Sequence, residues 1–384
     1  MTVEAITFKG QPQAARPIEV PISIAPMMDR TDRHYRYFMR QVTQHTLLYT
    51  EMVTAQAILH GDRDHLLGFT AAERPLVLQV GGDDPALLAA SARAAADFGY
   101  DAINLNVGCP SDRVRSGNFG ACLMAQPDRV ADAVATMMAA SPLPVSVKHR
   151  IGIDDLDRYD DMVRFVSTVA QTGCRHFTVH ARKAWLQGLS PKDNRTVPPL
   201  RYPEVHRLKR DFPHLWIEIN GGFTRLGQVT EQLNRVDAVM IGRAAYDQPY
   251  LFADVDLRFF GAAGGPGLKS WSQVRSRPQI VKAMLPYIDH WVGQGTKLNK
   301  LTRHMLMLFA GQPGSRQWKQ ILTAASGQPG AGVEVVQQAL AAVLRQGEIQ
   351  AQLAVEAQPL GVGGEGFRDP GKGVDVFVGA GEGG

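Results

Sequence analysis

Short apolar runs that alternate with longer amphipathic stretches place the strongest constraint on the fold of this chain. The short runs are rich in β-branched residues and largely apolar, as is typical of strands in a parallel sheet that helices cover. Eight runs have this character: 22–26, 46–50, 76–80, 102–106, 145–148, 176–180, 215–220 and 238–241. Eight strand–helix units in succession predict a (β/α)8 barrel, the TIM barrel fold, whose strands would be apolar on both faces.

The segments around these runs favour the barrel over a doubly wound sheet. Helical periodicity is clear in residues 85–98, 127–140, 155–172 and 226–233, each of which follows a predicted strand. A doubly wound sheet usually carries a G-x-G-x-x-G turn after its first strand. Here the first strand continues into Ala25-Pro26-Met27-Met28 instead, so the barrel is the better prediction.

The strand–helix alternation stops near residue 250, and the following segment predicts helices only. Residues 274–293, 297–309, 316–325 and 333–345 predict a helical bundle beside the barrel, interrupted by Gly-Gln-Pro-Gly turns. The predicted organisation is a leader at 1–20, the barrel at 21–260, a glycine-rich linker at 261–271, a helical domain at 272–347 and a glycine-rich, disordered tail at 348–384.

Composition excludes some classes of protein. No apolar run approaches the roughly 18 residues of a membrane helix, and the N-terminus lacks the pattern of a secretory signal, so we expect a cytoplasmic protein. The three cysteines include no C-x-x-C pair, which argues against a disulfide framework and a structural zinc site, and we expect no metal. A net charge of +4 permits a nucleic-acid partner without requiring one.

Polar side chains gather at the carboxyl ends of the predicted strands, where barrel enzymes keep their chemistry. After the fourth run, Asn106 and Cys109 precede a polar, glycine-studded loop. A cysteine at such a position could act as a nucleophile, a metal ligand or an acid. The cysteine spacing disfavours the metal role, and the residues alone leave the other two open.

Two glycine-bearing strand ends predict a phosphate site. Asn220-Gly221-Gly222 follows the seventh run, and Gly242-Arg243 follows the eighth. Bare glycine backbone lets N–H groups approach a phosphate, and the loops after strands seven and eight are the usual phosphate cradle of this fold. The planar guanidinium of Arg243 could bind the same phosphate through two hydrogen bonds.

Three further strand-end residues suit a flavin at the barrel mouth. Lys148 ends the fifth run, where a fixed cation would stabilise the anionic reduced ring. Gln79 could hydrogen-bond the flavin or a pyrimidine edge. His180 could contact a cofactor, although strand-end histidines often only cap backbone groups.

Taken together, these motifs resemble those of the tRNA-dihydrouridine synthases over about residues 20–345. Leu186-Gln-Gly-Leu-Ser-Pro-Lys-Asp-Asn-Arg and the segment from Arg303 to Gly314 are similar to the A subgroup, whose targets are uridines 20 and 20a of the tRNA D-loop. The other shared motifs are Ala25-Pro-Met-Met-Asp-Arg-Thr-Asp, Leu105-Asn-Val-Gly-Cys-Pro-Ser, Gly120-Ala-Cys-Leu-Met, Val147-Lys-His-Arg, Val179-His-Ala-Arg, Ile219-Asn-Gly-Gly and Val239-Met-Ile-Gly-Arg.

The resemblance implies reduction of uridine in tRNA to 5,6-dihydrouridine. Members of this family bind FMN, reduce it with NADPH, deliver hydride from flavin N5 to uracil C6, and protonate C5 with a cysteine. Cys109 would be that acid, since a thiol with a pKa of about 8.5 is mostly protonated at neutral pH. The implied FMN contacts are Pro26, Met27, Met28, Gln79, Lys148, His180, Asn220, Gly221, Gly222, Gly242 and Arg243.

A uridine inside folded tRNA must leave its stack to reach a flavin, so a basic surface around the barrel mouth is expected. Spacing suggests Arg33, Arg36 and Arg40 as one basic face of the first helix. The helical domain at 272–347 would help to bind tRNA, and we expect a monomer. The implied tRNA and uridine contacts are Asn106, Arg182, Lys192, Arg195, Lys300 and Arg303.

Two other functions stay open at the level of sequence. One is a different FMN barrel, such as a dihydroorotate-dehydrogenase-like enzyme that acts on a free pyrimidine, although such a substrate needs neither a basic loop nor a helical appendix. The other is a tRNA-binding protein without catalysis, which would have no use for Cys109 and Lys148. The preference for NADPH depends on the resemblance alone.

Overall fold

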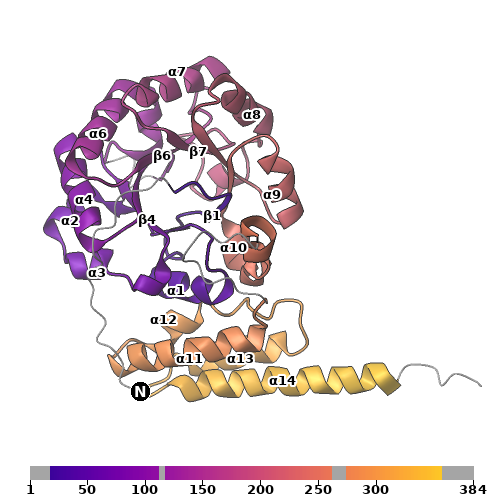
Figure 1. The fold of residues 1–384 in the computed structure, drawn as a ribbon. Coiled ribbons are helices and arrows are strands. Elements are labelled where there is room, and N and C mark those ends of the chain that lie inside the picture. Colours follow the sequence, from indigo (N-terminus) through magenta and orange to yellow (C-terminus); the bar gives the residue numbers. More distant parts are fainter. Residues whose placement is uncertain (1–17, 112–116, 262–273, 357–384) are drawn as a thin grey trace, which may run out of the picture.

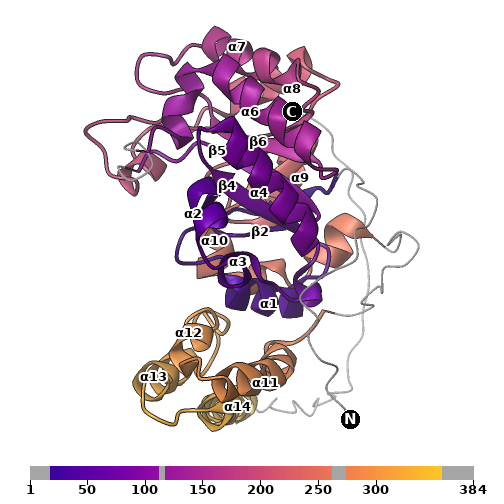
Figure 2. The ribbon, with the colours of Figure 1, turned by 90° about the vertical axis from the view of Figure 1, so that its left-hand side faces the viewer.

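The computed structural model describes residues 18–111, 117–261 and 274–356, which form a barrel and a helical bundle. Figure 1 looks at the ring of strands with the bundle below it, and Figure 2 shows the same two parts from the side. The predicted leader up to residue 17, most of the linker and the tail beyond residue 356 lie outside the described residues. In the described ranges, no helix is both long and apolar enough to cross a membrane.

A ring of parallel strands forms the barrel and confirms the predicted (β/α)8 fold. The strands are β1 (Ile22–Ile24), β2 (Leu48–Tyr49), β3 (Val53–Thr54), β4 (Leu76–Gly81), β5 (Ala102–Val107), β6 (Val145–Arg150), β7 (His176–His180), β8 (Trp216–Asn220) and β9 (Ala238–Ile241). They pair in the order β1-β9-β8-β7-β6-β5-β4-β2, and a parallel bridge between Ser23 and Leu47 closes the ring. The two-residue β3, which the sequence did not indicate, pairs with the end of β4.

Helices surround the ring of strands (Figure 1). They are α1 (Arg33–Val42), α2 (Ala55–His60), α3 (Arg63–Leu67), α4 (Pro85–Phe98), α6 (Pro127–Ala140), α7 (Tyr159–Ala170), α8 (Tyr202–Asp211), α9 (Leu226–Leu233) and α10 (Arg243–Asp247), with shorter turns η1 (Ala71–Glu73), η2 (Gly120–Ala125), η3 (Asp193–Arg195), η4 (Pro249–Phe252) and η5 (Asp256–Phe260). Helix α4 shows how local sequence sets the ends. Asp84 caps the first N–H groups, Pro85 fills the first turn, and Gly99 ends the helix at a φ of 82°.

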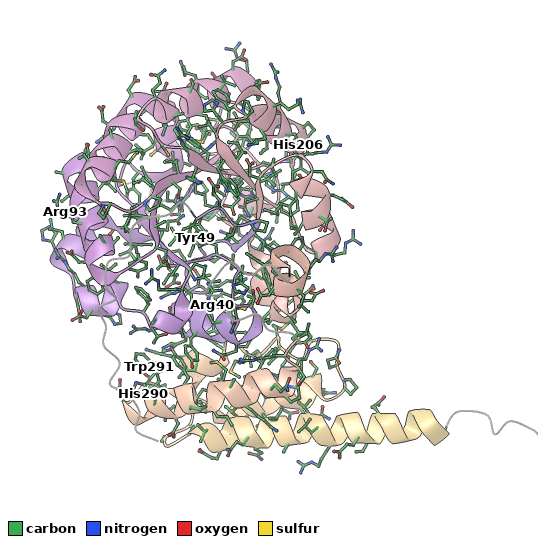
Figure 3. The ribbon with its side chains drawn as sticks, in the orientation of Figure 1. Arg40, Tyr49, Arg93, His206, His290 and Trp291 are labelled. Carbon is green, nitrogen blue, oxygen red and sulfur yellow. The ribbon has the colours of Figure 1, made fainter. Side chains whose placement is uncertain are left out.

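The inside of the barrel is more polar than the sequence predicts. Outward-facing side chains such as Leu78, Val80 and Ile103 are fully buried against the helices. The inward-facing positions instead include Gln79, Asn104, Asn106, Lys148, Thr178 and Glu218, which adjoin one another across β4 to β8. Figure 3 shows Tyr49 in the centre of the ring. The expectation of strands apolar on both faces was therefore wrong for these positions, whereas a separate apolar cluster that includes Leu47, Val77 and Met240 fills another part of the interior.

The bundle packs against the barrel through α1. Its helices are α11 (Arg277–Gly293), α12 (Leu298–Thr302), α13 (Ser315–Ala325) and α14 (Val333–Glu356). Both α11 and α12 contact α1, and Tyr287 of α11 stacks on Tyr37 of α1 with 3.8 Å between ring centroids. Within the bundle, the fully buried Trp318 donates its Nε1–H to the Met305 carbonyl at 3.0 Å.

Two helices of the bundle differ in length from the predictions. Helix α12 ends at Thr302, and the chain after it forms turns. The sequence predicted a helix to residue 309. Helix α14 continues to Glu356, past both the predicted helix end at residue 345 and the predicted start of the tail at 348. The segment contains a single glycine, Gly347, near the predicted helix end. One glycine costs a helix only about 1 kcal/mol, too little to end it.

Candidate active site

The loop after β5 carries Cys109, and hydrogen bonds fix both the backbone N–H and the backbone carbonyl of this residue. The Asn106 side chain accepts the N–H groups of Gly108 and Cys109 through Oδ1, each at 3.0 Å. The N–H of Ala121 donates to the Cys109 carbonyl at 2.9 Å. The thiol is half-buried, with its Sγ 3.5 Å from Ser111 Oγ. Asn106 therefore positions the cysteine, a task that the sequence did not reveal.

A chain of hydrogen-bonded side chains supports Asn106 from inside the barrel. Asn106 Nδ2 donates to Gln79 Oε1 at 2.9 Å, and Gln79 Nε2 donates to Asn104 Oδ1 at 2.8 Å. Asn104 Nδ2 then donates to Ser146 Oγ at 2.9 Å. Gln79 is buried, and its backbone N–H donates to Thr50 Oγ1 at 3.0 Å. Gln79 thus keeps one donor and one lone pair beyond these bonds.

Lys148 is a half-buried cation inside the barrel mouth. Strand register places it beside Asn106 on β5 and Thr178 on β7. Burial lowers the pKa of Lys148 to about 8, and the charge of Arg150 acts in the same direction, while Glu218 opposes them. A lowered lysine pKa means that the surrounding residues do not fully compensate the positive charge. An anionic ligand would complete this environment.

Arg150 joins the cysteine loop to the loop between β7 and α8. Its side chain is almost fully buried and donates to the carbonyls of Gly108 at 2.8 Å, Lys183 at 3.0 Å and Asn194 at 3.0 Å. Burial lowers the pKa of Arg150 to about 10. Because one guanidinium holds both loops, the cysteine and the β7–α8 loop form one framework.

A glycine turn follows β8. Gly221 has a φ of 128° and Gly222 a φ of 78°, which glycine adopts far more easily than other residues. A Cβ on Gly221 would lie 2.7 Å from Leu200 Cδ2 and 3.0 Å from His180 Cδ2. The Tyr202 hydroxyl holds the turn by donating to the Gly221 carbonyl at 2.5 Å. The turn therefore has no room for side chains and presents bare backbone beside His180.

Positive charges surround this glycine turn. Burial lowers the pKa of His180 well below its usual value, and four neighbouring cations act in the same direction: Arg150, Lys148, Arg182 and Arg243. His180 is therefore neutral near pH 7. Gly242 caps the N-terminus of α10, and none of the described side chains caps that end. Converging cations and uncapped N–H groups are the features of an anion site.

The remaining strand-end residues have different environments. Asn220 is buried and donates its Nδ2–H to the Met240 carbonyl at 2.8 Å, which fastens β8 to β9. Pro26 is half-buried at the end of β1. The Met27 N–H and carbonyl both bond Thr31, and Met28 is 54% exposed. The three β1-loop residues thus line the rim, whereas Asn220 lies deeper.

The β7–α8 loop brings the predicted loop cations to the mouth. Lys192 and Arg195 are exposed on and beside η3. Arg243 donates to the Arg195 carbonyl at 3.2 Å, and Arg182 donates to the carbonyls of Thr196 and Pro198. Arg182 and Arg195 therefore lie near the cations around the glycine turn, and Lys192 is exposed on the same loop.

The predicted basic face of α1 was wrong for two of its three arginines, while the third, Arg33, is half-buried with its guanidinium 4.9 Å from the Trp291 ring centroid. Arg36 and Arg40 are buried, and Arg36 Nε donates to Glu73 Oε2 at 2.7 Å. Arg40 donates to the carbonyls of Glu73, Thr43 and Pro75. Helical spacing gave these arginines a common face, but that face packs on the barrel because η1 supplies a buried carboxylate. They are structural residues and cannot form an RNA-binding surface.

The bundle cations lie apart from the cysteine and the glycine turn. Lys300 on α12 is exposed. Arg303 is partly exposed, and its Nη2 lies 2.5 Å from Oδ2 of Asp32, the N-cap of α1. His304 is buried, with its Nε2 3.0 Å from Oδ1 of the same carboxylate. Since Asp32 ends the loop that begins at β1, these contacts link the bundle to the rim of the mouth.

Two residues that shape the site had no clear sequence signal. Asn194 is fully buried and bonds both the N–H and the carbonyl of Trp185. Glu218 accepts from Ser23 Oγ at 2.5 Å and Thr178 Oγ1 at 2.6 Å inside the barrel. Burial raises the pKa of Glu218. An inward-facing acid in a strand is the only hint the sequence offers for Glu218.

Comparison with known proteins identifies the family of this chain. The family model for dihydrouridine synthase (Dus) matches residues 23–344. The chain belongs to the dihydrouridine synthase family. The tRNA-dihydrouridine(20/20a) synthase of Synechocystis sp. is 60% identical over 322 residues, covering 84% of this chain and 94% of the relative. The enzyme of the same name from Vibrio cholerae is 53% identical, covering 84% of this chain and 96% of the relative.

Membership of this family confirms the resemblance inferred from the motifs. The matched segment runs from β1 into α14, so it includes the barrel and most of the bundle. Among solved structures, an old yellow enzyme homologue from Zymomonas mobilis gives a TM-score of 0.45 at 13% identity, covering 63% of this chain and 88% of that chain. That likeness is too distant to bear on function.

Proposed function

We propose that this chain reduces uridines 20 and 20a in the D-loop of tRNA to 5,6-dihydrouridine, with FMN as cofactor and NADPH as reductant. The observation that carries the proposal is the arrangement of the mouth. Asn106 fixes the loop of a half-buried thiol, Cys109, and the cation Lys148 adjoins Asn106 in the neighbouring strand. Family membership and the names of the relatives support the same reaction.

The residues of the mouth fit a phosphorylated flavin. The side-chain-free turn at Gly221 and the converging cations suit a phosphate, and the incompletely compensated charge of Lys148 suits a reduced, anionic ring. When bound, FMN supplies the hydride for uracil C6 and is reduced again by NADPH. The residues that would hold it are Pro26, Met27, Met28, Gln79, Lys148, His180, Asn220, Gly221, Gly222, Gly242 and Arg243.

Cys109 acts as the acid in this proposal. Its thiol proton adds to C5 of the uracil ring, which completes saturation of the C5–C6 bond and leaves a thiolate that solvent reprotonates. Asn106 holds the cysteine backbone, and Arg150 holds the adjacent Gly108 carbonyl at 2.8 Å. A fixed acid protonates one carbon selectively, because the donor atom is already placed for transfer.

The tRNA would approach across a basic surface that includes both parts of the molecule. Figure 2 shows the β7–α8 loop projecting on the same side of the view as α12 and α13. The exposed cations of this surface would contact phosphates, whereas Asn106 and Arg182 would contact the uridine. The proposed tRNA contacts are Arg182, Lys192, Arg195, Lys300 and Arg303.

Replacement of the cysteine tests the reaction. In the FMN-loaded chain, Cys109→Ala should leave reduction of the flavin by NADPH intact but lower dihydrouridine formation in tRNA by about 10²–10⁴-fold, the usual contribution of a general acid. The matched control is Cys122→Ala. Cys122 is also half-buried, but its Sγ donates to the Phe119 carbonyl at 3.1 Å on η2. Dihydrouridine is measured by mass spectrometry of digested tRNA.

Three outcomes would contradict the proposal. Unchanged turnover of Cys109→Ala on tRNA would refute the acid role. Reduction of free pyrimidines in preference to tRNA would indicate the dihydroorotate-dehydrogenase-like alternative. A chain that binds tRNA but takes up no flavin would indicate a non-catalytic RNA-binding protein.

A further inference from the structure

Trp185 is an exposed aromatic side chain at the barrel mouth. Large hydrophobic side chains are exposed at few positions in the described ranges, and Trp185, at 38%, is the only aromatic one among them. It lies on the β7–α8 loop, seven positions before Lys192 and ten before Arg195 in the sequence. The exposed part of the side chain is not covered by the core, so it is available to a partner.

The indole is held in place although it faces solvent. The backbone N–H of Trp185 donates to Asn194 Oδ1 at 2.8 Å, and its backbone carbonyl accepts from Asn194 Nδ2 at 2.9 Å, so these two bonds fix the backbone that carries the indole. Lys183 Nζ lies 3.8 Å from the ring centroid. That ammonium is itself fixed by Asp157 Oδ2 at 2.9 Å. One face of the ring is therefore occupied by a cation, while the residue as a whole is 38% exposed.

The same contacts relate the ring to the reactive cysteine. Arg150 donates to the Lys183 and Asn194 carbonyls, which flank and anchor Trp185, and to the Gly108 carbonyl next to Cys109. A single buried guanidinium thus sets the position of the indole loop relative to the thiol. A base that stacks on the ring would be presented at the entrance to the site.

We propose that Trp185 is a stacking platform for a nucleobase adjacent to the target uridine in the tRNA D-loop. The proposal rests on the proposed function, because it assumes a tRNA substrate. The surrounding charge favours RNA over a protein partner, since the exposed cations Lys192 and Arg195 share the loop. Aromatic rings flanked by basic residues bind unstacked bases irrespective of base identity. The platform would compensate the stacking that is lost when the uridine leaves the helix.

Affinity for tRNA and its salt dependence test the platform in the FMN-loaded chain. Trp185→Ala should weaken tRNA binding by about 5- to 150-fold, the range for loss of one aromatic–base stack, and Trp185→Phe by much less. The slope of affinity against salt should not change, because stacking releases no counterions. Binding of tRNA should also quench tryptophan fluorescence in the wild type and quench it less in Trp185→Phe. The control Leu257→Ala removes a 48% exposed side chain from η5 and should change neither affinity nor fluorescence quenching.

The result separates this inference from the proposed function. If the wild type forms dihydrouridine but Trp185→Ala binds tRNA with unchanged affinity, the platform is refuted and the reaction stands. A weaker complex with a reduced salt slope would also overturn the platform, because it would mean that the loop cations had moved. If the wild type forms no dihydrouridine, the proposed function itself fails.

Discussion

Two pairs of cations look alike in the sequence and have opposite roles in the structure. Arg36 and Arg40 repeat at helical spacing on α1, while Lys192 and Arg195 stand three apart in the β7–α8 loop. The α1 pair is buried and fully engaged with the barrel, whereas the side chains of the loop pair are exposed at the mouth. A cationic residue in a sequence therefore indicates a binding surface only where no carboxylate or carbonyl elsewhere in the chain binds and buries it.

The acceptor for the α1 pair is Glu73. This carboxylate is fully buried and accepts from Arg36, and Oε1 also accepts from the Thr70 N–H at 2.7 Å. Among the described residues Arg40 makes no ion pair with a carboxylate and bonds three carbonyls, and burial lowers its pKa to about 9. Figure 3 shows Arg40 on the barrel side of α1. Both arginines contribute to docking of α1, which in turn supports the bundle.

The largest effect is expected from breaking the buried pair. Arg36→Met should lower the free energy of unfolding by roughly 3–5 kcal/mol, because it leaves the Glu73 carboxylate buried without a cation. Urea denaturation measures the change. Arg93→Met is the control, since Arg93 is an exposed residue of α4 on the rim of the view in Figure 3 and should shift stability by under about 0.5 kcal/mol. An equal, small loss in both variants would show that the α1 arginines are not structural.

An intermediate effect is expected at Asp32, which caps α1 and pairs with the bundle. Asp32→Ala should lower the free energy of unfolding by about 1 kcal/mol through loss of the cap. Asp32→Asn keeps a good cap and removes only the charge that faces Arg303 and His304. Comparison of the two variants by urea denaturation separates the cap from the ionic contact. If both variants lose the same stability, the cap contributes nothing beyond the charge.

The Asp32 charge also predicts a pH dependence. Burial alone would raise the pKa of Asp32, but His304, the backbone N–H of Tyr35 and Arg303 outweigh it and hold the pKa well below its usual value. Below about pH 4 the unfolded chain binds a proton that the folded chain does not, so stability falls as the pH is lowered. Melting temperature against pH should drop less steeply below about pH 4 in Asp32→Asn than in the wild type. If the melting temperatures of both proteins fell equally below about pH 4, Asp32 would not be ionised in the folded chain.

The sequence alone predicts some features of the site and not others. The strand ends were predictable because parallel strands bring their carboxyl ends to one face, which placed Asn106, Lys148 and the glycine turn correctly. The partner of Arg36 could not be predicted, since Glu73 lies 37 positions away and nothing in the local sequence indicates that Glu73 is buried. The role of Asn194 was hidden for the same reason, because a buried loop asparagine has the sequence signature of any turn residue. Local patterns predict elements and their ends, whereas side-chain partners across the fold need the structure.

The smallest effect on stability is expected at the loop pair, with a clear effect on binding. Lys192→Ala with Arg195→Ala should change the free energy of unfolding by under about 0.5 kcal/mol, since both side chains are exposed. The same double variant should reduce the slope of log affinity for tRNA against log salt by about 1.4 to 1.8, at 0.7 to 0.9 per lost phosphate contact. The β7–α8 loop keeps its shape, because Arg243 bonds the backbone carbonyl of Arg195 and not its side chain.

The control for the loop pair removes the same charge elsewhere. Arg93→Ala with Arg164→Ala takes two exposed arginines from α4 and α7, outside the mouth. If binding depended only on net charge, both double variants would lose affinity equally, and their salt slopes would fall by the same amount. A reduced slope confined to the loop variant would instead assign phosphate contacts to the β7–α8 loop. That result would complete the contrast with α1, where removal of an arginine lowers stability and leaves the salt slope unchanged.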